Sequence, residues 1–327
     1  MNGGRGALVR IGALALLWGS GFLWIKLALT GLSPVHLTLV RCALGALTLL
    51  ALAFAARQRL PRDRRTWGRL VIAAFFCNAL PFALFGIGER TVDSGIAGVM
   101  NATTPLWSLL IGVALGTDRR LNPVRLLGLA LGFGGVLVIF APWQQAGLLS
   151  AGALALLGAG LSYAIAFAYM ARKLPPDGAP LALSAAQLMT ATALTAVALP
   201  VASTAPHLTL TAVVAVTILG VFGTGITFYL NYRLLTDEGP TAAATVGYLL
   251  PVVSIGLGAL FLGEPLTPRV VGGMVIVLVA VGLTRWKAVT TGAPPRAGGS
   301  ATRNPPNAAQ VPAKGPASSP AGLAVPK

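Results

Sequence analysis

Four charged residues lie within or directly beside long apolar stretches, where they could hold a substrate, an ion or a proton. Lys26 and Arg41 fall inside such stretches, while Glu89 and Asp93 flank a short polar connection. Because an ionisable side chain is costly to place in hydrocarbon, each is a candidate functional residue. We expect a charge network in which Arg41 pairs with Glu89 or Asp93. The network could be structural, with Lys26 snorkelling to the interface, or it could serve a substrate or a coupled proton.

Polar and aromatic side chains also recur at helical spacing along the apolar stretches. Residues three or four positions apart share one face of a helix, so these side chains could line a pocket together. Small and polar residues also pack helices against one another in lipid, and that interpretation stays open for each of them. The candidate substrate-binding residues are Trp18, Phe22, Asn78, Phe82, Asn101, Thr104, Pro105, Tyr163, Thr224, Tyr248 and Pro251.

Two of these candidates are prolines that lie 146 positions apart in the middle of apolar stretches, Pro105 and Pro251. A proline inside a helix cannot donate a hydrogen bond to the carbonyl four residues before it. The carbonyls of Asn101 and Gly247 therefore need other partners in lipid. The two bends could line a central pathway, or they could be ordinary kinks.

The composition indicates a membrane protein and argues against a nucleic-acid-binding one. Charged residues make up 10% of the 327 positions, against about 25% in a typical soluble domain. The mean hydropathy is +0.79, which is typical of a chain that crosses the bilayer several times. The net charge is +16, but the basic residues lie between the apolar stretches, as topology signals do.

Residue types that perform catalysis or bind metals are scarce. The chain has two histidines, His36 and His207, and two cysteines, Cys42 and Cys77, without the spacing of a metal site. It has no nucleophile elbow and no phosphate-binding loop. We therefore expect no enzymatic activity, no metal and no cofactor, and two buried free thiols rather than a disulfide.

Uncharged stretches long enough to cross a bilayer predict an all-α membrane protein. The first stretch continues past Gly19 without a cleavage site, which favours a retained helix over a signal peptide. The residues after Ala288 are rich in Pro, Gly, Ala and Ser and predict disorder. The ten predicted transmembrane helices span residues 7–29, 35–56, 68–88, 94–115, 124–141, 150–171, 181–202, 211–233, 241–262 and 268–287.

The basic residues in the connections predict the orientation of the chain. If the N-terminus is inside, sixteen of them lie in inner segments, and only Arg90 and Arg269 lie outside. The positive-inside rule then places both termini in the cytoplasm, which agrees with an even number of helices.

The chain also repeats itself. Gly-Ala-Leu-Ala-Leu-Leu occurs at 12–17 and again at 152–157. An odd number of helices in each copy makes the two copies inverted, an architecture common among secondary transporters. We expect a first five-helix repeat in residues 1–145, a second in 146–287 and a disordered cytoplasmic tail in 288–327. The tail could be a weak anchor for anionic lipid or an untethered terminus.

Several of these residues resemble those of a known family. The marks are Trp18-Gly19-Ser20-Gly21-Phe22, Arg41, and matched segments at 97–128 and 243–273, the second of which contains Gly263-Glu264-Pro265-Leu266. The chain resembles the drug/metabolite transporter superfamily, EamA type. Asp118 is a departure, because a turn like that at Glu264 would be expected there. The resemblance implies export or exchange of small metabolites without an ATPase in the chain.

From these features we expect a secondary active or facilitated transporter, working as an exporter by alternating access in the cytoplasmic (inner) membrane. The low charge of the expected pocket favours small metabolites such as amino acids or related amphipathic compounds. The expected partners are this substrate and membrane lipid, without nucleic acid, and the protein would be a monomer or homodimer. The alternative is a non-transporting polytopic receptor or sensor.

Overall fold

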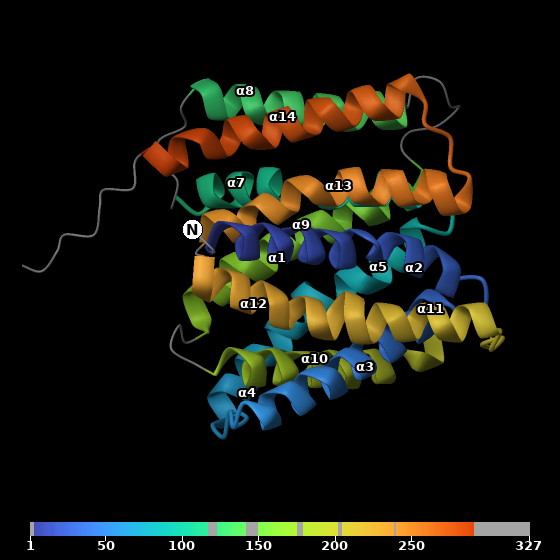
Figure 1. Cartoon of the computed structure of the whole chain (residues 1–327), viewed down its shortest axis with the longest axis vertical. Coiled ribbons are helices and arrows are strands. Elements are labelled where there is room, and N and C mark those ends of the chain that lie inside the picture. Colours follow the sequence, from blue (N-terminus) through green and yellow to red (C-terminus); the bar gives the residue numbers. More distant parts are fainter. Residues whose placement is uncertain are drawn as a thin grey trace, which may run out of the picture. The chain divides into compact units, whose positions relative to one another are not determined.

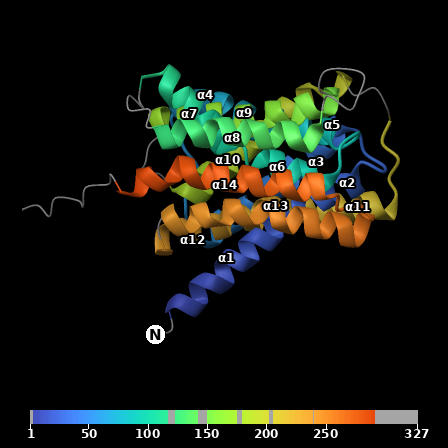
Figure 2. The same cartoon turned by 90° about the horizontal axis from the view of Figure 1, so that it is seen from above.

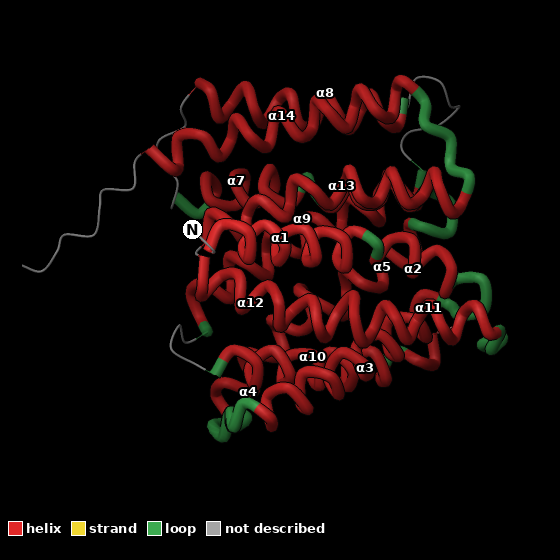
Figure 3. Tube along the Cα trace, in the orientation of Figure 1, coloured by secondary structure: helices red, strands yellow, loops and turns green. Residues whose placement is uncertain are grey.

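The computed structural model describes residues 3–116, 123–141, 150–174, 179–201, 205–238 and 240–290. Within these ranges all regular secondary structure is helical, as expected from the apolar stretches (Figure 3). Residues up to Val289 form one compact unit. Apart from its first three residues, the predicted tail at 288–327 lies outside the described residues.

The first half of the chain contains helices that follow the expected order. Several of the predicted single helices are divided into consecutive segments by turns or by a change of helix type. The elements are α1 (Gly3–Gly19), α2 (Gly21–Ala28), α3 (Pro34–Ala55), α4 (Arg64–Ala74), η1 (Phe75–Ala79), α5 (Leu80–Gly88), α6 (Ser94–Asn101), α7 (Thr104–Ala114) and α8 (Pro123–Phe140).

The second half repeats this order closely. Four of its elements begin 146 residues after their counterparts: Pro180 follows Pro34, Leu210 follows Arg64, Val221 follows Phe75 and Pro240 follows Ser94. The elements are α9 (Ala151–Lys173), α10 (Pro180–Val197), η3 (Leu199–Val201), α11 (Leu210–Gly220), η4 (Val221–Ile226), α12 (Thr227–Glu238), α13 (Pro240–Leu262) and α14 (Pro268–Thr290).

Seven described helical stretches are long and apolar enough to cross a membrane. Three further apolar helices, at Leu126–Ile139, Leu249–Leu262 and Pro268–Leu283, are shorter. The membrane-spanning character of the chain is therefore clear, while the total of ten spans stays a prediction. The seven stretches are Leu8–Ala28, Pro34–Ala55, Arg64–Gly88, Ser94–Ala114, Ala151–Lys173, Pro180–Val197 and Leu210–Leu234.

Side-chain caps set several of the helix starts. The Asp63 carboxylate accepts a hydrogen bond from the main-chain N–H of Thr66 at 2.7 Å, so α4 begins at Arg64 rather than at the expected residue 68. Ser33 and Thr209 cap α3 and α11 in the same way. A capping oxygen satisfies one of the N–H groups that the first turn of a helix leaves unpaired.

A π-helical segment interrupts the third span, and another interrupts the span at the equivalent place in the second half. These are η1 (Phe75–Ala79) and η4 (Val221–Ile226). In η4 the hydroxyl of Thr224 donates to the carbonyl of Leu219, five residues back, at 2.9 Å. Single π turns are rare and frequently occur at functional sites. Their occurrence at matched positions makes these two spans candidates for the functional site.

The two candidate prolines behave differently. Pro105 lies in the first turn of α7, after a break at Ala102 and Thr103 that separates α7 from α6, so it starts a helix where a bend had been expected. The carbonyl of Asn101 that this break frees accepts the hydroxyl of Thr104 at 2.8 Å. Pro251 does lie inside a helix, α13, as predicted. The chain thus supplies a local partner for the freed carbonyl at the first site.

The two halves interlock rather than lie side by side. Helix α1 packs against α12 and α13, while its counterpart α9 packs against α5 and α7 (Figure 1). Helix α3 of the first half packs against α10, η4 and α11 of the second. Figure 2 shows α8 and α14 together in the view from above, where Gly135 and Gly273 allow close approach. Side chains of both halves therefore meet along the whole bundle.

Candidate functional site

Arg41 is a buried cation at the contact between the two halves. Its side chain extends from α3, and the residue is only 6% exposed. The guanidinium carbon lies 3.6 Å from the centre of the Phe82 ring on α5, a cation–π arrangement. Nε donates a hydrogen bond to the hydroxyl of Thr224 in η4 at 3.0 Å. Three of the predicted site residues are therefore in direct contact.

A second buried polar pair joins α10 to η1. Nε2 of Gln187 donates to Oδ1 of Asn78 at 2.6 Å, and both side chains are buried. Nδ2 of Asn78 is fully buried and has no hydrogen-bond partner. A buried donor without an acceptor costs free energy, so this amide is ready to bind one. Asn78, a predicted site residue, thus has a buried N–H donor without an acceptor.

The two pairs are equivalent under the internal repeat. Gln187 follows Arg41 by 146 positions, and Thr224 follows Asn78 by the same number. In each pair a residue on the second predicted span of one half contacts a π-helical residue on the third predicted span of the other. The halves therefore make the same contact twice, once with a cation and once with a neutral amide.

Aromatic rings form a continuous row beside these pairs. Phe22 on α2 contacts Phe85 edge to face at 5.5 Å between ring centres, and Phe85 lies 6.2 Å from Tyr163 on α9. Tyr163 stacks on Phe167 at 5.9 Å. Tyr163 packs against the buried cluster that contains Phe82. The predicted residues Phe22, Phe82 and Tyr163 thus lie in connected apolar surroundings.

The expected ion pair between Arg41 and Glu89 is absent from the described residues. Glu89 is fully buried, and neither of its carboxylate oxygens has a hydrogen-bond partner. The prediction of this pair was wrong because Arg41 lies over Phe82, seven residues before Glu89, and a helix rises about 10 Å over that interval. Arg41 and Glu89 therefore belong to different levels of the bundle.

Lys26 instead binds main-chain carbonyls at the Glu89 level. Nζ donates to the carbonyl of Glu89 at 2.7 Å and to that of Val92 at 2.8 Å. These carbonyls lie at and beyond the end of α5, where the helix dipole favours a cation. Asp93 is half-buried nearby, and burial together with the Glu264 carboxylate raises the pKa of Asp93, against the opposing effect of Lys26. Lys26 rather than Arg41 is therefore the cation that lies beside Glu89, and it contacts main-chain carbonyls rather than a carboxylate.

Glu264 joins the second half to the first at the same end of the bundle. Its two carboxylate oxygens accept the main-chain N–H groups of Ser94, at 2.7 Å, and Gly95, at 3.0 Å. These N–H groups belong to the first turn of α6, where unpaired donors favour an anion. Gly263, in the left-handed region with φ of 65°, ends α13 and turns the chain toward this contact.

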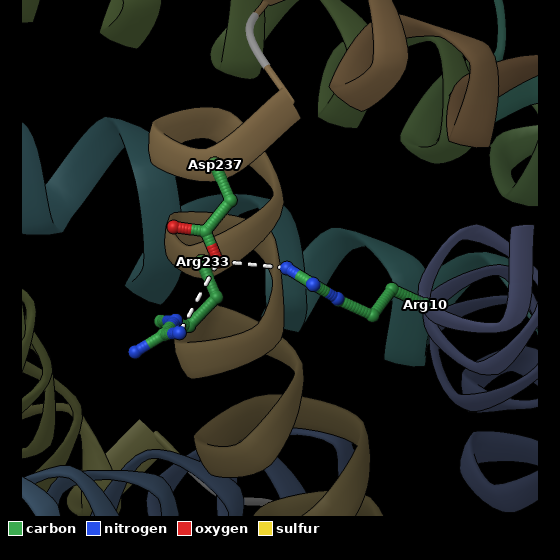
Figure 4. A network of polar contacts seen from close by, with 3 residues as sticks. All are labelled: Arg10, Arg233 and Asp237. Carbon is green, nitrogen blue, oxygen red and sulfur yellow. Dashed lines mark hydrogen bonds and ion pairs between the residues drawn. The ribbon is translucent and has the colours of Figure 1, made fainter. Parts of the chain in front are cut away.

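An ion pair joins the halves at the opposite end. Nη1 of Arg10 on α1 lies 2.7 Å from Oδ2 of Asp237 on α12, and Nη2 of Arg233 approaches the same oxygen at 3.2 Å (Figure 4). These side chains are substantially exposed. Exposed pairs contribute little stability, typically below about 1 kcal/mol. The pair therefore suits a contact that forms and breaks.

The remaining predicted site residues are spread more widely. Trp18 packs on a separate cluster around Leu14 and Leu234. At the α6–α7 break the hydroxyl of Thr104 donates a hydrogen bond to the main-chain carbonyl of Asn101. The carbonyl of Pro251 accepts the hydroxyl of Ser254 at 3.1 Å. The side chain of Tyr248 lies outside the described residues.

The sequence analysis missed Gln187 altogether, and it missed the hydrogen bonds by which Glu264 caps α6. The signal for Gln187 was available, because adding the repeat interval to Arg41 gives position 187. Glu264 was noticed only as a repeat counterpart, and its hydrogen bonds to Ser94 and Gly95 span 170 and 169 positions. The described residues contain no cluster of His, Cys, Asp and Glu that could hold a metal.

The helical spans and the repeated, interlocked halves define this chain as a multi-pass membrane protein of the transporter type. Residues 6–141 and 150–286 each match the EamA-like transporter family, and the chain belongs to that family. The two matched segments agree with the repeat seen in the elements. The chain is therefore a membrane transporter with two EamA repeats.

Individual relatives agree with the family match. The chain is 27% identical over 263 residues to the uncharacterized transporter YdfC of Bacillus subtilis (strain 168), covering 80% of this chain and 85% of the relative. It is 27% identical over 291 residues to the uncharacterized inner membrane transporter YedA of Escherichia coli (strain K12), covering 84% and 90%. A crystal structure with 18% identity shares the fold, with a TM-score of 0.62 over 88% of this chain and 99% of the other.

Proposed function

We propose that this protein is a secondary active or facilitated transporter that exports small amphipathic metabolites, such as amino acids, by alternating access. The observation that carries the proposal is the pair of equivalent contacts, Arg41–Thr224 and Gln187–Asn78, between the two halves. Transporters built from inverted repeats bind substrate where the halves meet and expose it to each side by rocking one half against the other. A symmetric pair of contacts near that interface suits such a motion.

Contacts between the halves at both ends of the bundle support the same mechanism. Glu264 caps α6 at one end, and Arg10 pairs with Asp237 at the other. If the two halves rock, one contact opens as the other closes. Each contact depends on a single carboxylate, so either can be released without unfolding a helix.

The location in the cytoplasmic membrane, with both termini inside, follows from the basic connections. Arg10 and Arg233 meet at one Asp237, so two segments assigned to the inner side do lie at the same end (Figure 4). That end would face the cytoplasm under the positive-inside rule. Export is the direction that the EamA resemblance favours.

The test is flux in proteoliposomes that contain the purified protein. Vesicles are loaded with a radiolabelled panel of amino acids and related compounds, and exit is followed with and without an external exchange substrate and with and without a pH gradient. Saturable exit of at least one compound, absent from protein-free vesicles, supports the proposal. Binding of a panel compound without any flux would favour a receptor or sensor instead.

A further inference from the structure

We propose that Arg41 binds the carboxylate of the transported molecule, and that the substrates are amphipathic compounds with a single carboxylate. The inference rests on the proposed transport function and names the chemistry of its substrate. Its site consists of Arg41, the Phe82 ring and the free amide of Asn78.

The first argument is that Arg41 has no ion pair at contact distance with any described residue, and the buried Glu89 carboxylate interacts with it only at longer range. Its described contacts are a hydroxyl, that of Thr224, and an aromatic face, that of Phe82. Among the described residues no carboxylate pairs with it. An arginine only 6% exposed pays a desolvation cost that a hydroxyl does not offset. A bound anion would offset it.

The second argument comes from the internal repeat. Gln187 occupies the position equivalent to Arg41 and makes the equivalent contact with Asn78. A neutral amide is therefore sufficient to join the halves at this place. The positive charge of Arg41 is not needed for packing, and its presence in one half alone creates one anion-binding position.

The third argument is a second donor on the same span as Phe82. Asn78 lies four residues before Phe82, about one helical turn away, and its Nδ2 is buried without an acceptor. Gln187 already occupies its Oδ1. The guanidinium and this amide are both donors, and a carboxylate with two oxygens accepts from both.

The surroundings limit the rest of the molecule. Phe82 is buried, and the row formed by Phe22, Phe85 and Tyr163 is apolar and aromatic. Lys26 is held by main-chain carbonyls of Glu89 and Val92, so it is not a second anion-binding group at this level. One available cation with apolar neighbours suits one carboxylate on an apolar body and disfavours a polyanion.

The test compares matched acids and amides as probes. The probes are 4-methylvalerate, L-leucine and N-acetyl-L-leucine, each with its primary amide. Binding is measured by intrinsic tryptophan fluorescence of the full chain in nanodiscs, and flux is measured in proteoliposomes. We expect at least one acid to bind about tenfold or more tightly than its amide.

Arg41→Gln is the decisive variant because Gln187 shows that glutamine fits the equivalent contact. It should elute normally in size exclusion and bind the acid about 10- to 100-fold more weakly, while binding of the amide stays unchanged, since a hydrogen bond between charged groups is lost. Arg90→Gln, at an exposed arginine, is the matched control and should bind like the wild type.

Each outcome bears on the inference. Equal affinity of Arg41→Gln and wild type for the acid overturns it, as does binding of amides in preference to acids or binding of no acid. Acid binding that depends on Arg41 in a protein without flux keeps this inference and removes the proposed transport. Flux of amides alone, insensitive to Arg41→Gln, keeps transport and removes this inference.

Discussion

Removing the Glu264 carboxylate should loosen the contact between α13 and α6 and lower the stability of the protein. Both carboxylate oxygens accept main-chain N–H groups, those of Ser94 and Gly95, at 2.7 and 3.0 Å. The two donors belong to the first turn of α6 and have no partner within that helix. In Glu264→Ala both would have to find water or stay unpaired.

The expected loss follows from these two hydrogen bonds. A hydrogen bond to a charged group contributes about 1.5 to 3 kcal/mol when buried, and an anion at a helix N-terminus adds about 0.3 to 1 kcal/mol. Because Glu264 is only partly buried, water screens its charge and replaces part of each interaction. We expect Glu264→Ala to lower the free energy of unfolding by about 2 kcal/mol. Glu264→Gln, which keeps one acceptor, should lose about half as much.

The assay is equilibrium unfolding of the full chain in mixed micelles of mild detergent and SDS. Leu266→Ala, two residues away, is the control because it truncates an exposed side chain that makes no such bond. The control should change stability by less than about 0.5 kcal/mol. If Glu264→Ala loses no more than Leu266→Ala, the cap contributes nothing and the reasoning is refuted.

Three further predictions test other parts of the bundle. Gln187→Ala should lower the free energy of unfolding by about 1 to 3 kcal/mol because it leaves the buried Oδ1 of Asn78 without its donor. A double variant with Asn78→Ala should lose less than the sum of the single losses, and additive losses would show that the two residues do not interact. Burial and Glu264 raise the pKa of Asp93, so the folded protein favours the protonated carboxyl. The contribution of Asp93 to the free energy of unfolding is therefore largest below about pH 4 and declines as the pH rises. Asp93→Asn should therefore gain stability over the wild type with increasing pH in unfolding titrations, and a constant difference would contradict this. Single cysteines at Ser33 and Ala205 in a cysteine-free background should react with an impermeant reagent from outside; reaction only after permeabilisation would reverse the orientation.

The sequence by itself determined the membrane-spanning helices and the repeat. An uncharged stretch in lipid must bond its own main-chain groups, and a helix does so locally, so length and composition suffice. The matched prolines and the repeated Gly-Ala-Leu-Ala-Leu-Leu segment made the repeat visible, and the element starts at Pro34 and Pro180 agree with the interval between the prolines. Helix ends were less accurate: Asp63 starts α4 early through a side-chain cap, and Pro105 starts a new helix instead of bending one.

The candidate site could be predicted only in part. Arg41, Phe82, Thr224 and Asn78 were all named from residue type and helical spacing. The structure places Arg41 against Phe82 and Thr224, whereas the partner of Asn78 is Gln187, which was not predicted. The π-helical segments that hold Asn78 and Thr224 could not be predicted, because spans that are apolar on most faces have no clear periodicity in which one extra residue in a turn would show.

Only the tertiary structure decided which charges meet. Opposite charges in or beside apolar stretches suggested that Arg41 and Glu89 could pair, but a contact also requires that the helices bring both side chains to the same place. Helix α3 packs on η4 and α5, and this packing brings Arg41 into contact with Phe82 and Thr224. Glu89 lies farther along the bundle, where Lys26 donates to its main-chain carbonyl. Glu264 reaches α6 because α13 packs along it. Such long-range contacts depend on how whole helices rotate and cross, which local spacing in one sequence does not encode.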